Sequence, residues 1–444
     1  MATPNTTSSA TRSLFQIELN EFDPVFIRRE SERLGLKNLL TVLDFNYHST
    51  TTDDEVEHQG LDPWVQWVNV HTGRPSAEHG IKRLGETWRQ TERETQIWER
   101  LSKDGRRWAA WGVMNAPAGT LSGCEAFMPD PWSFDEVAHP SRLNDVLALP
   151  RYMARNYTDN DKRVIAGKFL LFLKAYLNPV HWPTLVKFSM TAVPAMLRYG
   201  ASVHSLTTLL DFLGAIEFAH VRRKSRPDYS VIFLNHIAHL QHQFWHTGGT
   251  LHKEMELGLR VSDRIIGVLL ATRREDEALV VINGLRQKNV HGDGIFVYRQ
   301  INPRRAMEAI IGSTTHLGDW KVEQLMTNDA HLRLLNTNSA DAAEALLRQT
   351  VLSTGEPLLY VERLGDTHVF CQVDVEHAID TDVTYSNPHS SGKFYDVFES
   401  VCERTGSHIQ DGDVFADGIE LPERFHNHEI YGLTLDYFDV ENRS

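Results

Sequence analysis

The stretch from Tyr229 to His246 constrains the fold most, because a buried strand there runs directly into side chains that can bind metal. Residues 229–234 form a short apolar run rich in β-branched and aromatic residues, which is typical of a fully buried strand. Asn235 and four histidines follow at once: His236, His239, His242 and His246. On a helix, the last three share one face, with His236 at its edge. Three such imidazoles can bind a divalent transition metal; surface or hydrogen-bonded histidines are the alternative interpretation.

Two further predicted strands also end in polar side chains. The strand within residues 13–22 ends in Asn20 and Glu21, and the strand at residues 278–282 ends in Asn283. In open α/β sheets, ligands bind outside the carboxyl ends of the strands. We therefore expect Asn20, Asn235 and Asn283 to lie near one edge of a sheet.

The composition is that of a globular protein and argues against several classes of function, although it leaves room for a local basic patch. The 444 residues are 41% hydrophobic and 23% charged, and the net charge of −14 disfavours nucleic-acid and anionic-membrane partners. The three cysteines have no paired spacing, which fits a reducing compartment. Residues 1–12 lack the apolar core of a signal peptide, and the longest apolar stretches are interrupted by charges. We expect a soluble, cytoplasmic protein.

Alternating buried strands and helices predict an α/β fold with a mostly parallel central sheet and helices on both of its faces. The sequence divides as follows: a disordered tail (1–12), a first core part (13–132), a helical insertion or cap (133–225), a second core part (226–302), an α/β insertion (303–400) and a C-terminal core part (401–444). Within this scheme we expect residues 394–404 to form a helix.

Several motifs occur in an order that resembles the alkaline phosphatase superfamily, and within it the type I phosphodiesterase/nucleotide pyrophosphatase branch. They are Thr72-Gly73 with His79-Gly80-Ile81, Asn235-x-x-x-His239, and Gly406-Ser407-His408. The resemblance implies an alkaline phosphatase-like fold and hydrolysis of phosphoric esters with bound zinc. It also implies metal ligands at Asn235, His239 and His408, to which His236 or His242 could be added.

The chain departs from this family pattern at the positions that carry the most charge. Asparagine replaces the family aspartate at Asn20, Asn235 and Asn283. The position that corresponds to the family's Ser or Thr nucleophile lies near Asp62, and neither residue type occurs there. Because an amide is a neutral and weaker ligand than a carboxylate, we expect a reduced metal site. Glu18, Glu21 or Asp23 could restore negative charge at the end of the first strand.

Two functions remain open at this point. The first is a metal-assisted hydrolase of a small phosphoric or related ester, whose nucleophile is water or Asp62, with Thr72 and His71 as further catalytic candidates. The second is a protein that has lost hydrolysis and binds a polar ligand or partner in an asparagine-lined pocket. The sequence leaves open the substrate, the number of metal ions and the oligomeric state.

Overall fold

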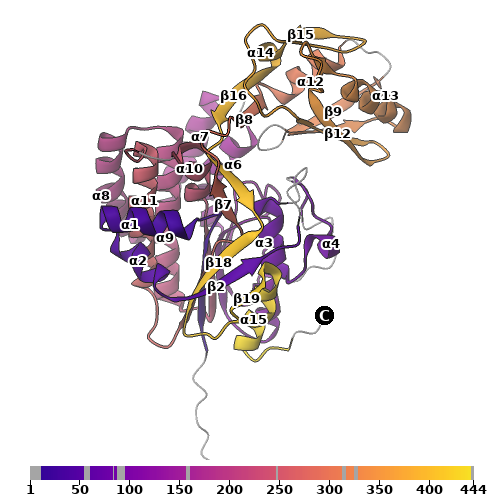
Figure 1. The fold of residues 1–444 in the computed structure, drawn as a ribbon. Helices are drawn as coiled ribbons and strands as arrows, with labels where there is room; N and C mark the ends of the chain where they lie inside the picture. Colours follow the sequence, from indigo (N-terminus) through magenta and orange to yellow (C-terminus); the bar gives the residue numbers. More distant parts are fainter. Residues whose placement is uncertain are drawn as a thin grey trace, which may run out of the picture.

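The computed structural model describes residues 12–54, 61–83, 85–87, 96–156, 161–246, 249–312, 317–324 and 329–441. The tail expected over residues 1–12 therefore lies, apart from Arg12, outside the described residues. An eight-stranded sheet forms the centre of the molecule (Figure 1). Its strands, in spatial order, are β19 (Arg424–His426), β2 (Asn46–Thr51), β18 (Asp411–Asp417), β6 (Ala278–Ile282), β1 (Leu14–Leu19), β5 (Tyr229–Leu234), β3 (Trp108–Val113) and β4 (Cys124–Pro129).

The central strands are parallel and end level with one another. β1 pairs in parallel with β5 and with β6, so that Leu19 lies beside Leu234 and Glu18 beside Ile282. β18 is antiparallel to both of its neighbours, β2 and β6. The predicted mostly parallel sheet is confirmed. So is the prediction that the asparagines after β1, β5 and β6 lie at one edge of it.

Helices cover both faces of this sheet because its central strands are apolar on both sides. Phe15, Ile17 and Ile232 face one core, whereas Leu14 and Val231 face the other, as the alternation of side chains along a strand requires. The first face carries α1 (Pro24–Leu34), α2 (Lys37–Leu43), α9 (Val203–Ser225), α10 (His236–Phe244) and α11 (Lys253–Leu270). The second carries α3 (Pro63–Thr72), α5 (Ile97–Lys103) and α15 (Ile430–Tyr437), with the short α4 (Ser76–His79) and η5 (Asn427–Glu429) nearby.

A helical layer follows β4 in the chain. It consists of α6 (Arg142–Arg155), α7 (Lys162–Ala175), η3 (Pro179–His181), α8 (Trp182–Tyr199) and α9. α9 lies directly on the sheet, and α7 and α8 lie outside it (Figure 1). No helix within the described ranges is both long enough and apolar enough to cross a membrane.

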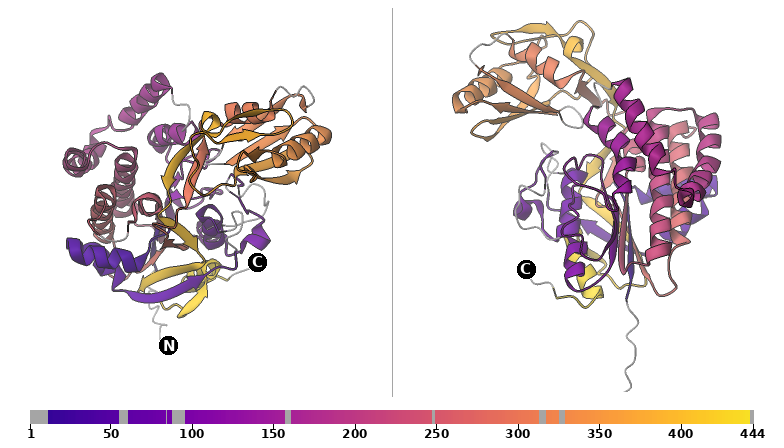
Figure 2. Two further views of the ribbon diagram at one scale, coloured as in Figure 1. Left: turned by 45° about the horizontal axis from the view of Figure 1, so that its top comes forward. Right: turned by 180° about the vertical axis from the view of Figure 1, so that it is seen from behind.

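A second lobe with its own core lies beyond the carboxyl ends of the central strands (Figure 1, Figure 2). It contains β9 (Trp320–Gln324), β10 (Asp329–Leu334), β12 (Leu359–Gly365), β13 (His368–Val373), α12 (Pro303–Ile311) and α13 (Thr337–Arg348), with the short β11 (Val351–Leu352), β14 (Thr384–Ser386), β15 (Ser391–Lys393) and α14 (Phe394–Val397).

Two antiparallel ribbons lead from the sheet to this lobe. One pairs β7 (Arg286–Asn289) with β17 (Gly406–Ile409), and the other pairs β8 (Phe296–Gln300) with β16 (Phe398–Glu403). The helix predicted over residues 394–404 is therefore wrong beyond Val397. Pairing with β8, which is about a hundred residues distant in sequence, determines the strand there and overrides the local pattern.

Candidate metal centre

Three ligand atoms converge above the ends of the central strands. Among the residues that the structure describes, Glu21, His242 and His408 are the one group of three with the types and spacing of metal ligands. Glu21 Oε2 lies 2.9 Å from His242 Nε2 and 3.0 Å from His408 Nε2, and the two Nε2 atoms lie 3.3 Å apart. The carboxylate is buried, and both imidazoles are partly buried. We refer to these three residues as the Glu–His–His cluster.

Three different elements place the cluster. Glu21 follows β1 with φ of 56°, in the left-handed region that a non-glycine residue adopts only under constraint. Its N–H donates to the carbonyl of Asn283 at 3.1 Å, which ties the bend to the end of β6. His242 lies in the last turn of α10, and His408 lies on β17. The cluster thus joins the sheet edge, a helix end and the base of the ribbon.

Backbone carbonyls fix how both imidazoles present their nitrogens. His242 Nδ1 lies 2.9 Å from the carbonyl oxygen of Gly406, and His408 Nδ1 lies 2.8 Å from that of Leu61. A carbonyl oxygen can only accept, so each Nδ1 carries a hydrogen and each neutral ring points an Nε2 lone pair at the cluster. Metal-binding histidines in proteins are held by the same kind of outer contact.

The charges within the cluster favour a bound cation. Burial alone would raise the pKa of Glu21, but His408 and His242 hold it well below its usual value. Burial would lower the pKa of His408, yet the Glu21 and Asp62 carboxylates raise it overall. The site therefore combines fixed negative charge with two nitrogen lone pairs, which either protons or a metal ion can satisfy.

The spacing fits a tetrahedral ion. Ligand atoms about 2.0–2.1 Å from a tetrahedral zinc ion stand roughly 3.3 Å apart, close to the 2.9, 3.0 and 3.3 Å separations in the cluster. Two histidines, one glutamate and an open fourth position are also a ligand set found in catalytic zinc sites. Gln287 supports the carboxylate from outside, because its Nε2 donates to Glu21 Oε2 and, at 3.1 Å, to the carbonyl of Ala238.

Asn20, Asn235 and His239 form a chain of hydrogen bonds beside the cluster. Asn20 Nδ2 donates to Asn235 Oδ1 at 2.7 Å and to Glu21 Oε1 at 3.0 Å, while Asn20 Oδ1 accepts from Trp67 Nε1 at 2.7 Å. Asn235 Nδ2 lies 3.2 Å from Nε2 of His239, which is exposed. Asn20 thus orients the carboxylate of the Glu–His–His cluster, and Asn235 and His239 continue the chain beside it.

Asn283 and His236 lie in separate hydrogen-bond networks. Asn283 Nδ2 donates to the carbonyl of Phe22 and to Asp413 Oδ2, both at 2.8 Å, and its Oδ1 accepts from the Asp413 N–H at 2.8 Å. His236 bridges Asp211 Oδ2 at 2.8 Å and the Ser262 hydroxyl at 2.7 Å. Asp211 also accepts from the N–H groups of Asn235 and His236, so it holds the start of α10 in place.

Of the three predicted catalytic residues, Asp62 is the one near the cluster. It begins α3, and its Oδ1 accepts from the Trp64 N–H at 2.7 Å. Burial raises the pKa of Asp62, and the neighbouring His408 limits that rise.

Thr72 and His71 lie at the opposite end of α3, roughly 15 Å along the helix axis from Asp62. The Thr72 hydroxyl donates to the carbonyl of Val68 at 2.7 Å. His71 Nε2 lies 2.8 Å from Glu18 Oε1, in the core between Trp67 and Trp98. Both side chains therefore make internal contacts at a distance from the cluster.

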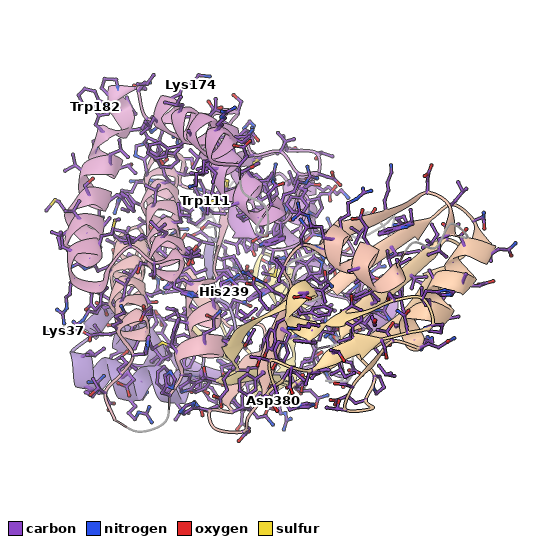
Figure 3. All side chains as sticks on the ribbon, turned by 90° about the horizontal axis from the view of Figure 1, so that it is seen from above. Lys37, Trp111, Lys174, Trp182, His239 and Asp380 are labelled. Carbon is purple, nitrogen blue, oxygen red and sulfur yellow. The ribbon has the colours of Figure 1, made fainter. Side chains whose placement is uncertain are left out.

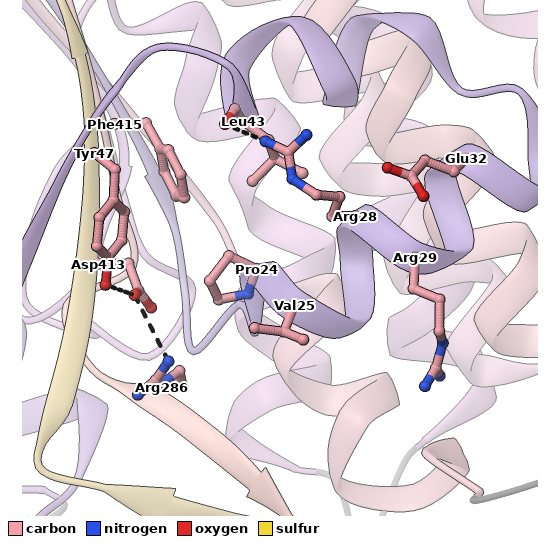
Figure 4. A pocket seen from close by; sticks show the side chains of 10 residues that line it. All are labelled: Pro24, Val25, Arg28, Arg29, Glu32, Leu43, Tyr47, Arg286, Asp413 and Phe415. Carbon is pink, nitrogen blue, oxygen red and sulfur yellow. Dashed lines mark hydrogen bonds and ion pairs between the residues drawn. The ribbon is translucent and has the colours of Figure 1, made fainter.

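A pocket of about 420 Å³ lies between α1, β2 and β18 (Figure 4). Within it, the Tyr47 hydroxyl donates to Asp413 Oδ1 at 3.0 Å, and Arg286 lies 3.7 Å from the same carboxylate. None of the site residues predicted from the sequence lines this pocket.

Comparison with known proteins finds similarity in the fold alone and none in the sequence. No protein-family model matches the sequence, and no curated protein matches it. Human ectonucleotide pyrophosphatase/phosphodiesterase 5 is 9% identical, with 98% of this chain and 96% of that one covered at a TM-score of 0.49. The murine protein is also 9% identical, with the same coverage and a TM-score of 0.47. Sinorhizobium meliloti phosphonoacetate hydrolase, solved with phosphonoformate, is 13% identical, with 96% of each chain covered and a TM-score of 0.43.

These solved structures are members of the alkaline phosphatase superfamily. It is the superfamily whose motifs the sequence resembles. At identities of 9 to 13%, however, the chemistry has to be judged from this chain's own residues.

Proposed function

We propose that this protein is a metal-dependent hydrolase of small phosphoric or related esters, with one divalent ion of the zinc class held by the Glu–His–His cluster. The observation that carries the proposal is the convergence of Glu21 Oε2, His242 Nε2 and His408 Nε2 within 3.3 Å, with both Nδ1 atoms fixed by carbonyls. A bound ion would polarise the ester oxygen and stabilise the negative charge that develops on it.

Asp62 is the residue that we assign to the attack on the ester. It lies next to His408 and begins a helix, and its carboxylate is available either to accept a proton from water or to attack directly. The two routes differ in whether a covalent intermediate forms. Direct attack by Asp62 expels the alcohol and leaves an aspartyl phosphate, which borohydride reduction of the acid-quenched protein converts to homoserine, whereas attack by water leaves no phosphorylated protein.

Binding of a polar ligand without hydrolysis finds less support. That function requires the three asparagines to offer free amides, but Asn20 and Asn283 each use both ends of the amide on protein partners. The cytoplasmic location remains part of the proposal, and the three free cysteines fit it.

Metal content is the direct test. The full chain, purified without a histidine tag or added metal, is analysed by elemental mass spectrometry before and after EDTA. We expect about one zinc-class ion per chain, lost in Glu21→Gln, His242→Ala and His408→Ala. His246→Ala is the matched control, because this exposed residue follows the same helix and lies beside His291 instead of the cluster. No bound metal, and no stabilisation on adding any, would contradict the proposal.

Activity is measured on the same proteins. We expect the metal-loaded chain to hydrolyse bis(4-nitrophenyl) phosphate or 4-nitrophenyl phosphate, and Glu21→Gln to lose that activity while retaining its circular dichroism spectrum. If the metal-loaded protein is inactive on both substrates and on related esters, the metal site would still be supported, but the hydrolase function would be contradicted.

A further inference from the structure

The helical layer exposes an unusual amount of apolar surface. Nine apolar side chains on α7, α8, α9 and the segments between them are each more than half exposed, and we call them the apolar face: Leu170 (65%), Leu177 (71%), Val180 (61%), Trp182 (55%), Val186 (59%), Met190 (72%), Val193 (55%), Leu197 (84%) and Val203 (64%). Single exposed apolar residues are ordinary, but such a concentration on consecutive elements marks an interaction surface.

The apolar face follows from helical periodicity. On α8, the exposed positions Trp182, Val186, Met190, Val193 and Leu197 recur every three or four residues and so share one side of the helix. The opposite side of the layer is already satisfied, because Tyr176, Phe188 and Leu213 pack together between α7, α8 and α9. The helices thus have an inner apolar face that the fold covers and an outer one that it leaves open.

The charge on this segment is opposite to that of the whole chain. Residues 162–210 contain six cations and no Asp or Glu, in a protein of net charge −14. They are Lys162, Arg163, Lys168, Lys174, Lys187 and Arg198. Lys174 and Arg198 have acidic neighbours on other helices, Asp145 at 3.6 Å and Glu256 at 3.1 Å. The segment itself remains positive around an apolar surface.

We propose that the apolar face docks on the surface of an anionic lipid bilayer. Leucine, methionine and tryptophan side chains that project between lysines and arginines are the composition of helices that lie in the membrane interface. The cations would contact the lipid phosphates, and each would add to the attraction toward an anionic surface. A second copy of the chain is a less suitable occupant, because a symmetric contact would set these cations against each other.

The net charge predicted no membrane partner, but that total averages over a segment whose charge has the other sign. The apolar face also lies apart from the candidate metal centre. Lys174 and Trp182 lie at the outer edge of the helical layer, whereas His239, which borders the cluster, lies near the centre (Figure 3). Docking there leaves the site edge of the sheet free, and the inference does not rest on the proposed function.

Vesicle flotation with the full chain tests the proposal. We expect at least tenfold stronger partitioning to phosphatidylcholine vesicles that contain about 30 mol % phosphatidylglycerol than to phosphatidylcholine alone, and weaker binding as salt is raised. The double variant Leu170→Asp/Leu197→Asp should lose this binding. Its matched control is Val25→Asp/Leu335→Asp, which places the same charges at positions 72% and 67% exposed on other parts of the molecule.

A charge variant and the oligomeric state complete the test. Lys162→Gln/Lys174→Gln should reduce the preference for anionic vesicles several-fold, and Lys37→Gln/Lys393→Gln, at exposed lysines elsewhere, should not. Circular dichroism checks that each variant is folded. Absence of vesicle binding by the unmodified chain would overturn the proposal. So would sedimentation of a dimer that Leu197→Asp dissociates, since a second copy would then cover the face.

Discussion

His242 and His408 bring their Nε2 atoms to within 3.3 Å of each other. Two neutral imidazoles in this arrangement would direct lone pairs at one another, because the Nδ1 atom of each ring is bonded to a carbonyl. A cation between them relieves the repulsion, and the buried Glu21 carboxylate adds the negative charge that attracts one. The predictions about the site follow from this relationship.

The first prediction concerns the outer support of the carboxylate. Gln287→Met removes the donor to Glu21 Oε2 while keeping a side chain of similar length. Because outer contacts of metal ligands typically contribute 10–100-fold to affinity, we expect zinc affinity to fall by about that factor. Competition with a chromogenic chelator measures it. Gln96→Met, at a buried glutamine before α5, is the control. Unchanged affinity in a folded Gln287→Met protein would contradict the assigned cluster.

The second prediction asks why an asparagine stands at position 20. Asn20→Asp would remove the donors to Glu21 Oε1 and Asn235 and place a second buried carboxylate about 3 Å from the first. We expect the metal-free protein to lose about 3 kcal/mol of unfolding free energy, and added zinc to recover part of it. Chemical denaturation with and without zinc measures both effects.

The control for this variant is Asn336→Asp. Asn336 caps α13 by accepting from the Ser339 N–H, a role that aspartate fills equally well, so its stability should be nearly unchanged. An Asn20→Asp protein as stable as the original without metal would show that the amide is not required as a donor.

The sequence predicted the sheet and its polar edge well, because buried parallel strands leave a strong local pattern. Asn20, Asn235 and Asn283 follow β1, β5 and β6, and the aligned register brings them to one edge. The cluster itself was only partly predicted. His408 and His242 were named as ligands, whereas Glu21 entered only as a source of negative charge.

The remaining parts depend on tertiary contacts that no local pattern records. Gln287 reaches Glu21 because it pairs with His408 across the β7–β17 ribbon, and nothing in the spacing of residues 287 and 408 indicates that register. The exposed apolar face likewise depends on tertiary packing. Periodicity shows that α8 has an apolar side, but only packing shows that Met190 and Leu197 face outward.

The third prediction concerns pH. Asp130 follows β4, and burial raises the pKa of its carboxyl to about 7. The folded protein therefore keeps the proton up to about pH 7, whereas the unfolded chain releases it near pH 4. Stability from this group is thus present at low pH and is lost as pH rises between these values.

Asp130→Asn should remove that loss. We expect the variant and the original protein to be similarly stable near pH 4, and the variant to be more stable at pH 8, by at most about 4 kcal/mol. Urea unfolding at both pH values measures the difference. Asp276→Asn, at an exposed aspartate, should show no such pH dependence. An Asp130→Asn advantage that is equal at both pH values would contradict the shifted pKa.

The last prediction tests the glycine that lets β17 approach α10. A Cβ at position 406 would lie 2.8 Å from the Gln241 carbonyl oxygen and overlap the Gln287 side chain, so Gly406→Ala must push the ribbon away from the helix. The Gly406 carbonyl also orients His242 through its Nδ1. We expect Gly406→Ala to cost about 1–3 kcal/mol of stability and to weaken zinc binding. Gly365→Ala, where a Cβ meets nothing within 4 Å, should change neither. Thermal unfolding and chelator competition on the two variants decide the matter, and unimpaired zinc binding by a destabilised Gly406→Ala would separate this contact from the metal centre.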